Sequence, residues 1–199
     1  MNVEEIAKNS TEKERFYLRN PRGRLMKEQI DTIHSYIDAL YFQDNISNTL
    51  RRKLIGGNFG VAMFEIDKLG GEVLFAHSKI DVSLNEEIPQ HEPNSFQNYY
   101  NNFVPLLKTR DFKTLMINSK GKEETEENGA WDREIDTESK LLEYINKKIT
   151  EANLPKTTRG TIHLFTELPP CKSCEGVIKE FIEKYSNCIE IELYVRRSF

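Results

Sequence analysis

The last third of the 199-residue chain constrains the fold most, because its apolar spacing switches between helical and extended periods. Residues 141–149 and 177–185 carry apolar side chains at three- and four-residue steps, which predicts two amphipathic helices. Gly160 opens the β-branched and aromatic run 161–165, and residues 189–195 alternate, so both runs are predicted strands. A strand, a helix and a second strand in this order predict parallel pairing with a right-handed crossover, within an α/β layered sandwich.

A β-hairpin is predicted upstream of these elements. Residues 59–66 and 72–77 are strand-like, and Gly70-Gly71 lies in the turn between them. Residues 112–118 are the candidate for a further strand, and residues 119–130 form a charged segment that we expect to be a loop.

The N-terminal quarter has a different character. Residues 1–24 are charged and without an apolar pattern, whereas apolar residues recur at helical spacing from Leu25 until Gly56-Gly57 ends the pattern. We therefore expect a charged arm and an amphipathic helical segment over 1–55, followed by one α/β domain over 56–199.

Charge and hydropathy limit the kinds of partner that the chain can bind. The apolar runs are too short to span a bilayer, and the first residues lack the apolar stretch of a signal peptide, so we expect no membrane association and no targeting signal in this chain. The net charge of −4 gives no global basic field for nucleic acid, although a local groove remains compatible with it. Three cysteines make a poor disulfide framework. Cys171 and Cys174 are better interpreted as metal ligands or a redox pair, and Cys188 as a buried thiol.

Two short motifs stand at the starts of the two predicted C-terminal helices. Asp136-Thr137-Glu138 precedes the first, and Pro170-Cys171-Lys172-Ser173-Cys174 opens the second. Free N–H groups and the helix dipole favour anions at such positions. Hydrolytic zinc sites use three protein ligands and leave one position for water, together with a carboxylate that moves protons without being a ligand. We therefore predict Asp136, Cys171 and Cys174 as Zn²⁺ ligands and Glu138 as the proton shuttle.

Each motif alone has simpler interpretations. Asp-Thr-Glu is a common helix N-cap pattern, and one C-x-x-C fits a redox pair or two buried cysteines. A closed four-cysteine zinc ribbon would need a second cysteine pair, which the sequence lacks. If Asp136 is only a cap, His77 is the best candidate for the first ligand. The order of both motifs around a strand favours a metal site.

The same segments carry a family resemblance. Residues 131–145 and 160–181, with 57–66 and 76–81 upstream, resemble bacterial toxin-type members of the cytidine-deaminase-like superfamily. The resemblance covers about 57–196. It implies a three-layer α/β sandwich in which an N-terminal hairpin is followed by helix, strand, helix and strand around a zinc site. The family's usual first ligand is His or Cys, and Asp136 departs from that pattern.

The resemblance also implies a function. It points to a zinc-dependent hydrolase acting on C–N bonds, which deaminates a nucleobase within DNA or RNA. The favoured reaction is the conversion of cytosine to uracil. A toxin effector of this kind would act in the cytoplasm of a target cell and have an immunity protein as partner. The alternatives are a deaminase of a free nucleoside or small amine, and a non-catalytic zinc-stabilised interaction module. DNA and RNA, cytosine and adenine, and the oligomeric state stay open.

Further side chains are candidates for contacting the substrate. The predicted substrate-binding residues are Asn58, His77, Ser78, Trp131 and Thr166. A phosphate track is predicted from Lys108, Arg110, Lys113, Arg196 and Arg197.

Overall fold

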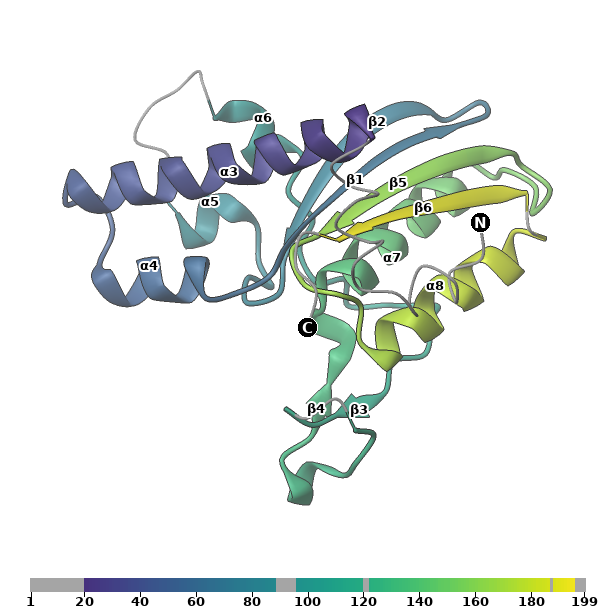
Figure 1. Cartoon of the computed structure of the whole chain (residues 1–199). Coiled ribbons are helices and arrows are strands. Elements are labelled where there is room, and N and C mark those ends of the chain that lie inside the picture. The colour runs from purple at the N-terminus through teal and green to yellow at the C-terminus, as the bar shows by residue number, and fades with distance from the viewer. Residues whose placement is uncertain (1–19, 89–95, 120–121, 187, 196–199) are drawn as a thin grey trace.

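One four-stranded sheet organises the computed structural model, which describes residues 20–88, 96–119, 122–186 and 188–195 (Figure 1). Its strands lie in the order β2-β1-β5-β6. Their bounds are β1 Phe59–Ile66, β2 Gly70–His77, β5 Gly160–Thr166 and β6 Ile189–Val195. β1 pairs antiparallel with β2 and with β5, while β5 and β6 are parallel. The predicted hairpin and the predicted parallel pair are both confirmed.

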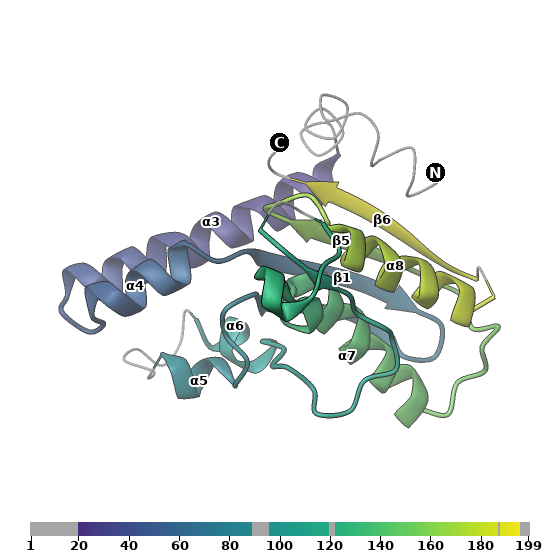
Figure 2. The same cartoon turned by 90° about the horizontal axis from the view of Figure 1, so that it is seen from below.

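Helices cover both faces of this sheet, so the mixed α/β prediction is confirmed (Figure 2). One face carries α7 (Thr137–Glu151) and α8 (Lys172–Lys184), whose apolar stripes pack with Ala62, Phe64 and other alternate strand residues. The other face packs Val61, Phe165 and their neighbours against α3 (Pro21–Phe42). Because both faces of the sheet are covered, the inner strand β1 is apolar nearly throughout, whereas the edge strand β6 keeps its alternation, with Glu190 exposed.

The N-terminal helical pattern forms two helices in place of one continuous stripe. α3 begins at Pro21, so residues 21–24, which we expected in the charged arm, form its first turn, and Asn20 Oδ1 caps it by accepting from Arg22 N at 2.9 Å. α4 (Asn48–Ile55) begins separately, because Ser47 Oγ accepts a hydrogen bond from Leu50 N. Residues 1–19 lie outside the described part of the chain. The domain boundary at residue 55 stays a prediction, and α3 lies directly on the sheet.

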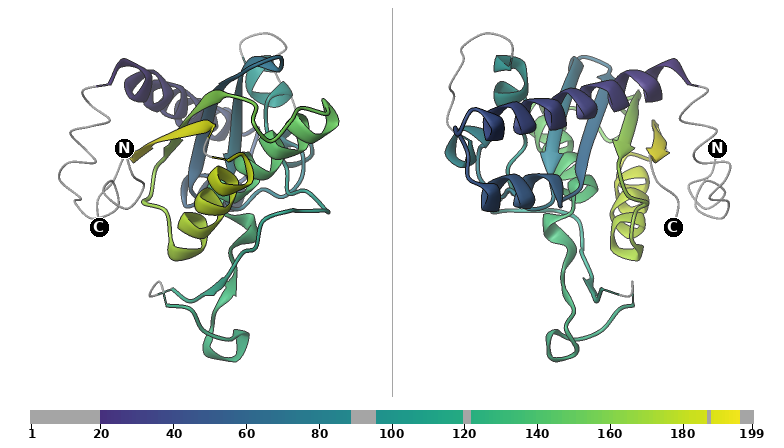
Figure 3. Two further views of the ribbon diagram at one scale, coloured as in Figure 1. Left: turned by 90° about the vertical axis from the view of Figure 1, so that its right-hand side faces the viewer. Right: turned by 60° about the vertical axis from the view of Figure 1, so that its left-hand side comes forward.

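A long connection between β2 and α7 contains short elements. These are α5 Leu84–Glu87, α6 Gln97–Asn101, β3 Met116–Ile117, η1 Glu126–Asn128, β4 Trp131–Asp132 and η2 Arg133–Ile135. The strand predicted over 112–118 is reduced to β3, which pairs with β4 in a separate two-stranded sheet. Side chains take the backbone N–H groups that a longer strand would use: Glu143 accepts from Phe112 N and Ser173 from Leu115 N. Figure 3 shows residues 116–119 and 122–132, the β3–β4 arm, projecting from the body.

No described helix is both long enough and apolar enough to cross a bilayer.

A close approach fixes where α7 begins. A β-carbon at Gly60 of β1 would lie 2.8 Å from Thr137 Cβ and 3.2 Å from Leu141 Cδ1, which is tighter than side chains tolerate without a shift. Gly60 therefore lets the first turn of α7 rest directly on the strand.

Gly60→Ala should lower the free energy of unfolding by about 1–3 kcal/mol, because the added methyl overpacks the contact between β1 and α7. Gly176→Ala on α8 is the matched control, since a β-carbon there meets nothing within 4 Å. Alanine should leave stability unchanged or raise it by up to about 1 kcal/mol at that helical position. Urea unfolding followed by circular dichroism measures both, and equal effects of the two substitutions would contradict the close-approach argument.

Candidate functional site

Asp136 and Cys171 occupy equivalent positions at the starts of neighbouring helices. Asp136 is the N-cap of α7, Cys171 is the N-cap of α8, and Cys174 follows in the first turn of α8. Neither capping residue uses its side chain to accept a hydrogen bond from its own helix. The simple interpretation of Asp136 as a side-chain cap therefore does not describe this structure, and its carboxylate is directed elsewhere.

The three side chains converge on one point. Cys171 Sγ and Cys174 Sγ donate to Asp136 Oδ2 at 3.2 and 3.3 Å, and the two sulfur atoms are 3.4 Å apart. Within the described ranges, this is the group of three acidic, thiol or imidazole side chains whose ligand atoms lie within 4.8 Å of one another. Tetrahedral zinc with bonds of roughly 2.3 Å holds two sulfur ligands about 3.8 Å apart, so the cluster matches the size of such a site.

Glu138 lies beside this cluster without belonging to it. Its side chain is buried, and Oε2 accepts from Thr137 Oγ1 at 3.0 Å and faces Cys174 Sγ at 3.6 Å. Burial, and then the negative charge of Asp136, raise the pKa of Glu138 to about 7. A carboxyl with a pKa near neutrality can both accept and release a proton.

The cluster concentrates acidic groups in a small volume. The hydrogen bond with Cys171, followed by burial and the charges of Glu138 and Asp136, raises the pKa of the Cys174 thiol. Arg133 Nη1 approaches Asp136 Oδ1 at 3.6 Å and offsets part of this charge. A bound cation would offset the rest and stabilise the thiolates. The donor set therefore fits a divalent metal.

Asn58 joins three segments around the cluster. Its Nδ2 donates to Thr137 Oγ1 at 3.1 Å and to Thr166 Oγ1 at 2.9 Å. Its Oδ1 accepts from the backbone N–H groups of Glu167 and Leu168. These four bonds use the full capacity of the amide. Asn58 therefore connects Thr166 to Thr137, which lies beside the cluster. Contact of Asn58 and Thr166 with a substrate stays a prediction.

His77 is not part of the metal-sized cluster. It is fully buried, its Nε2 donates to Leu54 O at 2.8 Å, and its Nδ1 accepts from Lys79 N at 3.1 Å. Burial lowers the pKa of His77 to about 3, so the ring is neutral. A β-carbon at Gly57 would overlap this ring, so the glycine makes room for it. The alternative with His77 as first ligand is therefore not supported by its position.

The two remaining predicted substrate-binding residues, Ser78 and Trp131, lie on different sides of the cluster. Ser78 Oγ accepts from Asn58 N at 2.9 Å, at the rim formed by the ends of β1 and β2. Trp131 on β4 is 39% exposed, and the Arg133 guanidinium lies 4.1 Å from the centre of its ring. Since Arg133 also approaches Asp136, Trp131 borders the site from the side of the β3–β4 arm.

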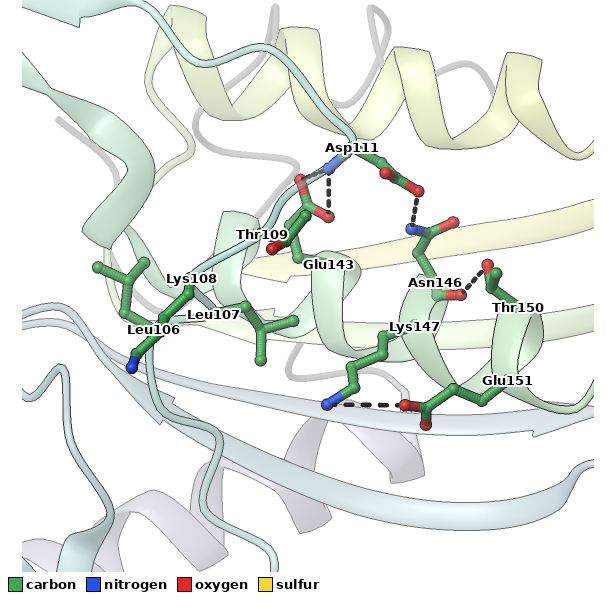
Figure 4. Close-up of a pocket in the computed structure, with 10 residues that line it drawn as sticks. All are labelled: Leu106, Leu107, Lys108, Thr109, Asp111, Glu143, Asn146, Lys147, Thr150 and Glu151. Atoms are coloured by element: carbon green, nitrogen blue, oxygen red, sulfur yellow. Dashed lines mark hydrogen bonds and ion pairs between the residues drawn. The ribbon is translucent and has the colours of Figure 1, made fainter.

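The basic residues of the predicted phosphate track have different surroundings. Lys108 lines a cavity of about 520 Å³ beside α7, and the lining also includes Asp111, Glu143 and Glu151 (Figure 4). Arg110 pairs with Glu134. Lys113 is exposed, and Arg196 and Arg197 lie outside the described residues. None of the predicted metal, catalytic or substrate residues lines this cavity.

One residue that supports the site was missed from the sequence. Lys140 on α7 is buried, and its Nζ donates to His77 O, Ile80 O and Asp81 Oδ1 at 2.7–3.0 Å. It ties the first turns of α7 to the turn after β2. A single lysine inside a helical stripe gives no signal of this role in the sequence.

The Toxin-deaminase model, described as the BURPS668_1122 family of deaminases, matches residues 40–197. The chain belongs to this family. Comparisons with curated proteins and with solved structures give no match. The resemblance inferred over 57–196 is confirmed, and the match extends it upstream into α3. The toxin-deaminase match includes Glu138 and all three residues of the Asp/Cys/Cys cluster.

Replacing His77 by Gln should reduce the acid sensitivity of this toxin-deaminase. The folded state keeps His77 neutral down to about pH 3, whereas an unfolded histidine binds a proton below about pH 6.5. The unfolded state therefore binds more protons in this window, and stability falls with falling pH by at most about 1.4 kcal/mol per unit. Urea unfolding between pH 7 and pH 5 should show a shallower loss in the variant, although its stability at pH 7 is lower. Parallel curves would show that His77 does not titrate in this way.

Proposed function

We propose that the chain is a zinc-dependent hydrolytic deaminase that removes the exocyclic amine from a nucleobase within DNA or RNA. The favoured reaction is the conversion of cytosine to uracil. The observation that carries the proposal is the pairing of a three-donor cluster with a separate buried carboxyl. Asp136, Cys171 and Cys174 have donor atoms within 3.4 Å of one another, and Glu138 lies next to them. Membership of a deaminase family supports it.

The donor set supports zinc as the metal. Two thiolates and a carboxylate are ligands that zinc accepts. The described residues supply three such donors, as in catalytic zinc sites, whereas closed structural sites have four protein ligands. Zinc held there would supply Lewis-acid activation of a water molecule, whose pKa would fall towards about 7. A purely structural site would have no use for the extra carboxyl of Glu138.

Glu138 is the proton carrier in this proposal. Deamination adds the oxygen of water to the amine-bearing ring carbon, breaks the C–N bond and releases ammonia, so one proton of the water must move to the ring nitrogen and another to the amine. Glu138 Oε2 takes and returns these protons, and Thr137 Oγ1 fixes its orientation at 3.0 Å. Asn58 holds Thr137 in turn. As a member of a toxin family, the protein would act in a target cell's cytoplasm, with an immunity protein as its partner.

Asp136→Ala should lose most of the bound zinc, because it removes one of three ligands. Asp136→Cys and Asp136→His should retain zinc, since both residues are zinc ligands. Elemental analysis of protein purified without chelator measures the content, with a wild-type expectation of about one zinc per chain. Loss of a helix cap alone would cost about 1 kcal/mol and leave the metal in place. Full zinc content in Asp136→Ala would therefore remove Asp136 from the ligand set.

Glu138→Gln should leave zinc content and melting temperature near wild type and lower deamination by at least about a hundredfold, because it removes the proton carrier and keeps the shape. Sequencing of single-stranded DNA and RNA exposed to the protein, read for C-to-T and A-to-G changes, measures the activity and identifies the base. Glu151→Gln is the matched control, since Glu151 is an exposed carboxylate at the opposite end of the same helix and should leave deamination unchanged. A fully active Glu138→Gln protein would contradict the assignment.

A further inference from the structure

The β3–β4 arm presents an acidic surface beside the site. Residues 119–130 carry four glutamates and two lysines, and Glu123, Glu126 and Glu127 are exposed. The arm reaches the cluster through Arg133, which approaches Asp136, and through Lys172 of α8, which pairs with Glu123. A polyanionic substrate that approached from the arm would meet like charge.

A second surface, formed by the end of α4 and the turn after β2, has the opposite character. Arg52 in the last turn of α4 and Lys79 in the turn are both exposed. Neighbouring basic residues are matched, Arg51 by Asp38 and Lys53 by Glu87. Within the described part of the chain, Arg52 and Lys79 have no ion pair of this kind.

Lys79 lies against the C-terminal end of the helix that carries Arg52. A β-carbon at Gly56 would be 2.8 Å from Arg52 O and 3.3 Å from Lys79 Nζ, so the Lys79 ammonium lies over the residue that ends α4. The absence of a side chain at Gly56 leaves this space to the lysine. Figure 1 shows α4 and the β3–β4 arm extending from the body in different directions.

Direct contacts lead from this surface to the candidate proton carrier. Asn58 N donates to Ser78 Oγ, and Ser78 N donates to Asn58 O at 3.0 Å, so the turn that carries Lys79 lies against Asn58. Asn58 Nδ2 binds Thr137 Oγ1, which donates to Glu138. Lys79 therefore borders the side of the site on which Asn58 lies, and the end of α4 that carries Arg52 lies next to it.

We propose that Arg52 and Lys79 bind the phosphodiester backbone of a polynucleotide substrate and set the side from which the strand enters. This inference rests on the proposed function and names the binding surface that serves it. It is separate from the phosphate track expected from Lys108 and Arg110, of which Arg110 pairs with Glu134 and Lys108 lines a cavity that also contains Asp111, Glu143 and Glu151. Backbone contacts of this kind carry affinity and position the strand without reading its sequence.

The test compares the wild-type chain with Arg52→Gln, Lys79→Gln and the double variant, with Lys122→Gln on the arm as the matched control. Binding of cytosine-containing single-stranded DNA and RNA oligonucleotides is measured across a range of salt concentrations. The slope of log K against log salt should fall in magnitude by about 0.7 for each lost phosphate contact. The double variant should lose roughly 1.4 of slope and at least about tenfold in kcat/KM on oligonucleotides, and Lys122→Gln should lose neither.

Three outcomes separate the two proposals. An unchanged slope in the double variant, with salt-dependent binding in the wild type, overturns this inference and leaves the proposed function intact. A wild-type protein that deaminates free cytidine but neither binds nor modifies oligonucleotides overturns both the polymer substrate and this inference. Loss of zinc or a lowered melting temperature in the double variant, accounting for its loss of activity, would show that the cations stabilise the fold, and this also overturns the inference.

Discussion

The antiparallel pairing of β1 with β5 is the constraint on which the candidate site depends. The register sets Gly60 opposite Thr166, so the start of one strand lies beside the end of the other. Asn58 can therefore bind the chain that leaves β5 and the first residue of α7 at once. The chain that leaves β5 becomes α8 within a few residues, and for this reason the two helices begin at the same edge. A different register would separate Asp136 from the cysteines.

Local signals in the sequence were sufficient for the elements that surround the site. The hairpin, the parallel strands and the two helix starts each follow from residue spacing, and they bring Asp136 close to Cys171 and Cys174. Interactions between distant segments were not predictable in this way. Nothing near Lys140 indicates that its ammonium will be buried, because its carbonyl partners, His77 at the end of β2 and Ile80 after it, are distant in the sequence. The length of β3 was overestimated, since Glu143 and Ser173 on later helices take the N–H groups of that segment.

α7 is held in place by charged side chains as well as by its apolar stripe. Lys140 donates to backbone carbonyls on one side, while Glu143 accepts from backbone amides on another. Burying such groups is costly unless every polar atom finds a partner, and removal of a partner destabilises strongly. These anchors fix the rotation of the helix about its axis, which apolar packing alone defines less sharply. The direction in which the Glu138 side chain points therefore depends on this fixed rotation of α7.

The overlap that a side chain at Gly57 would make with His77 has an evolutionary consequence. The two positions cannot vary independently, because any β-carbon at residue 57 would occupy the space of the imidazole ring. Relatives that keep a histidine at the end of β2 should keep glycine before the strand that contains Phe59. Relatives with a larger residue there should carry a smaller one at the histidine position, and would need another donor for the Leu54 carbonyl. Paired substitution at these two sites is therefore expected to mark subgroups within the family.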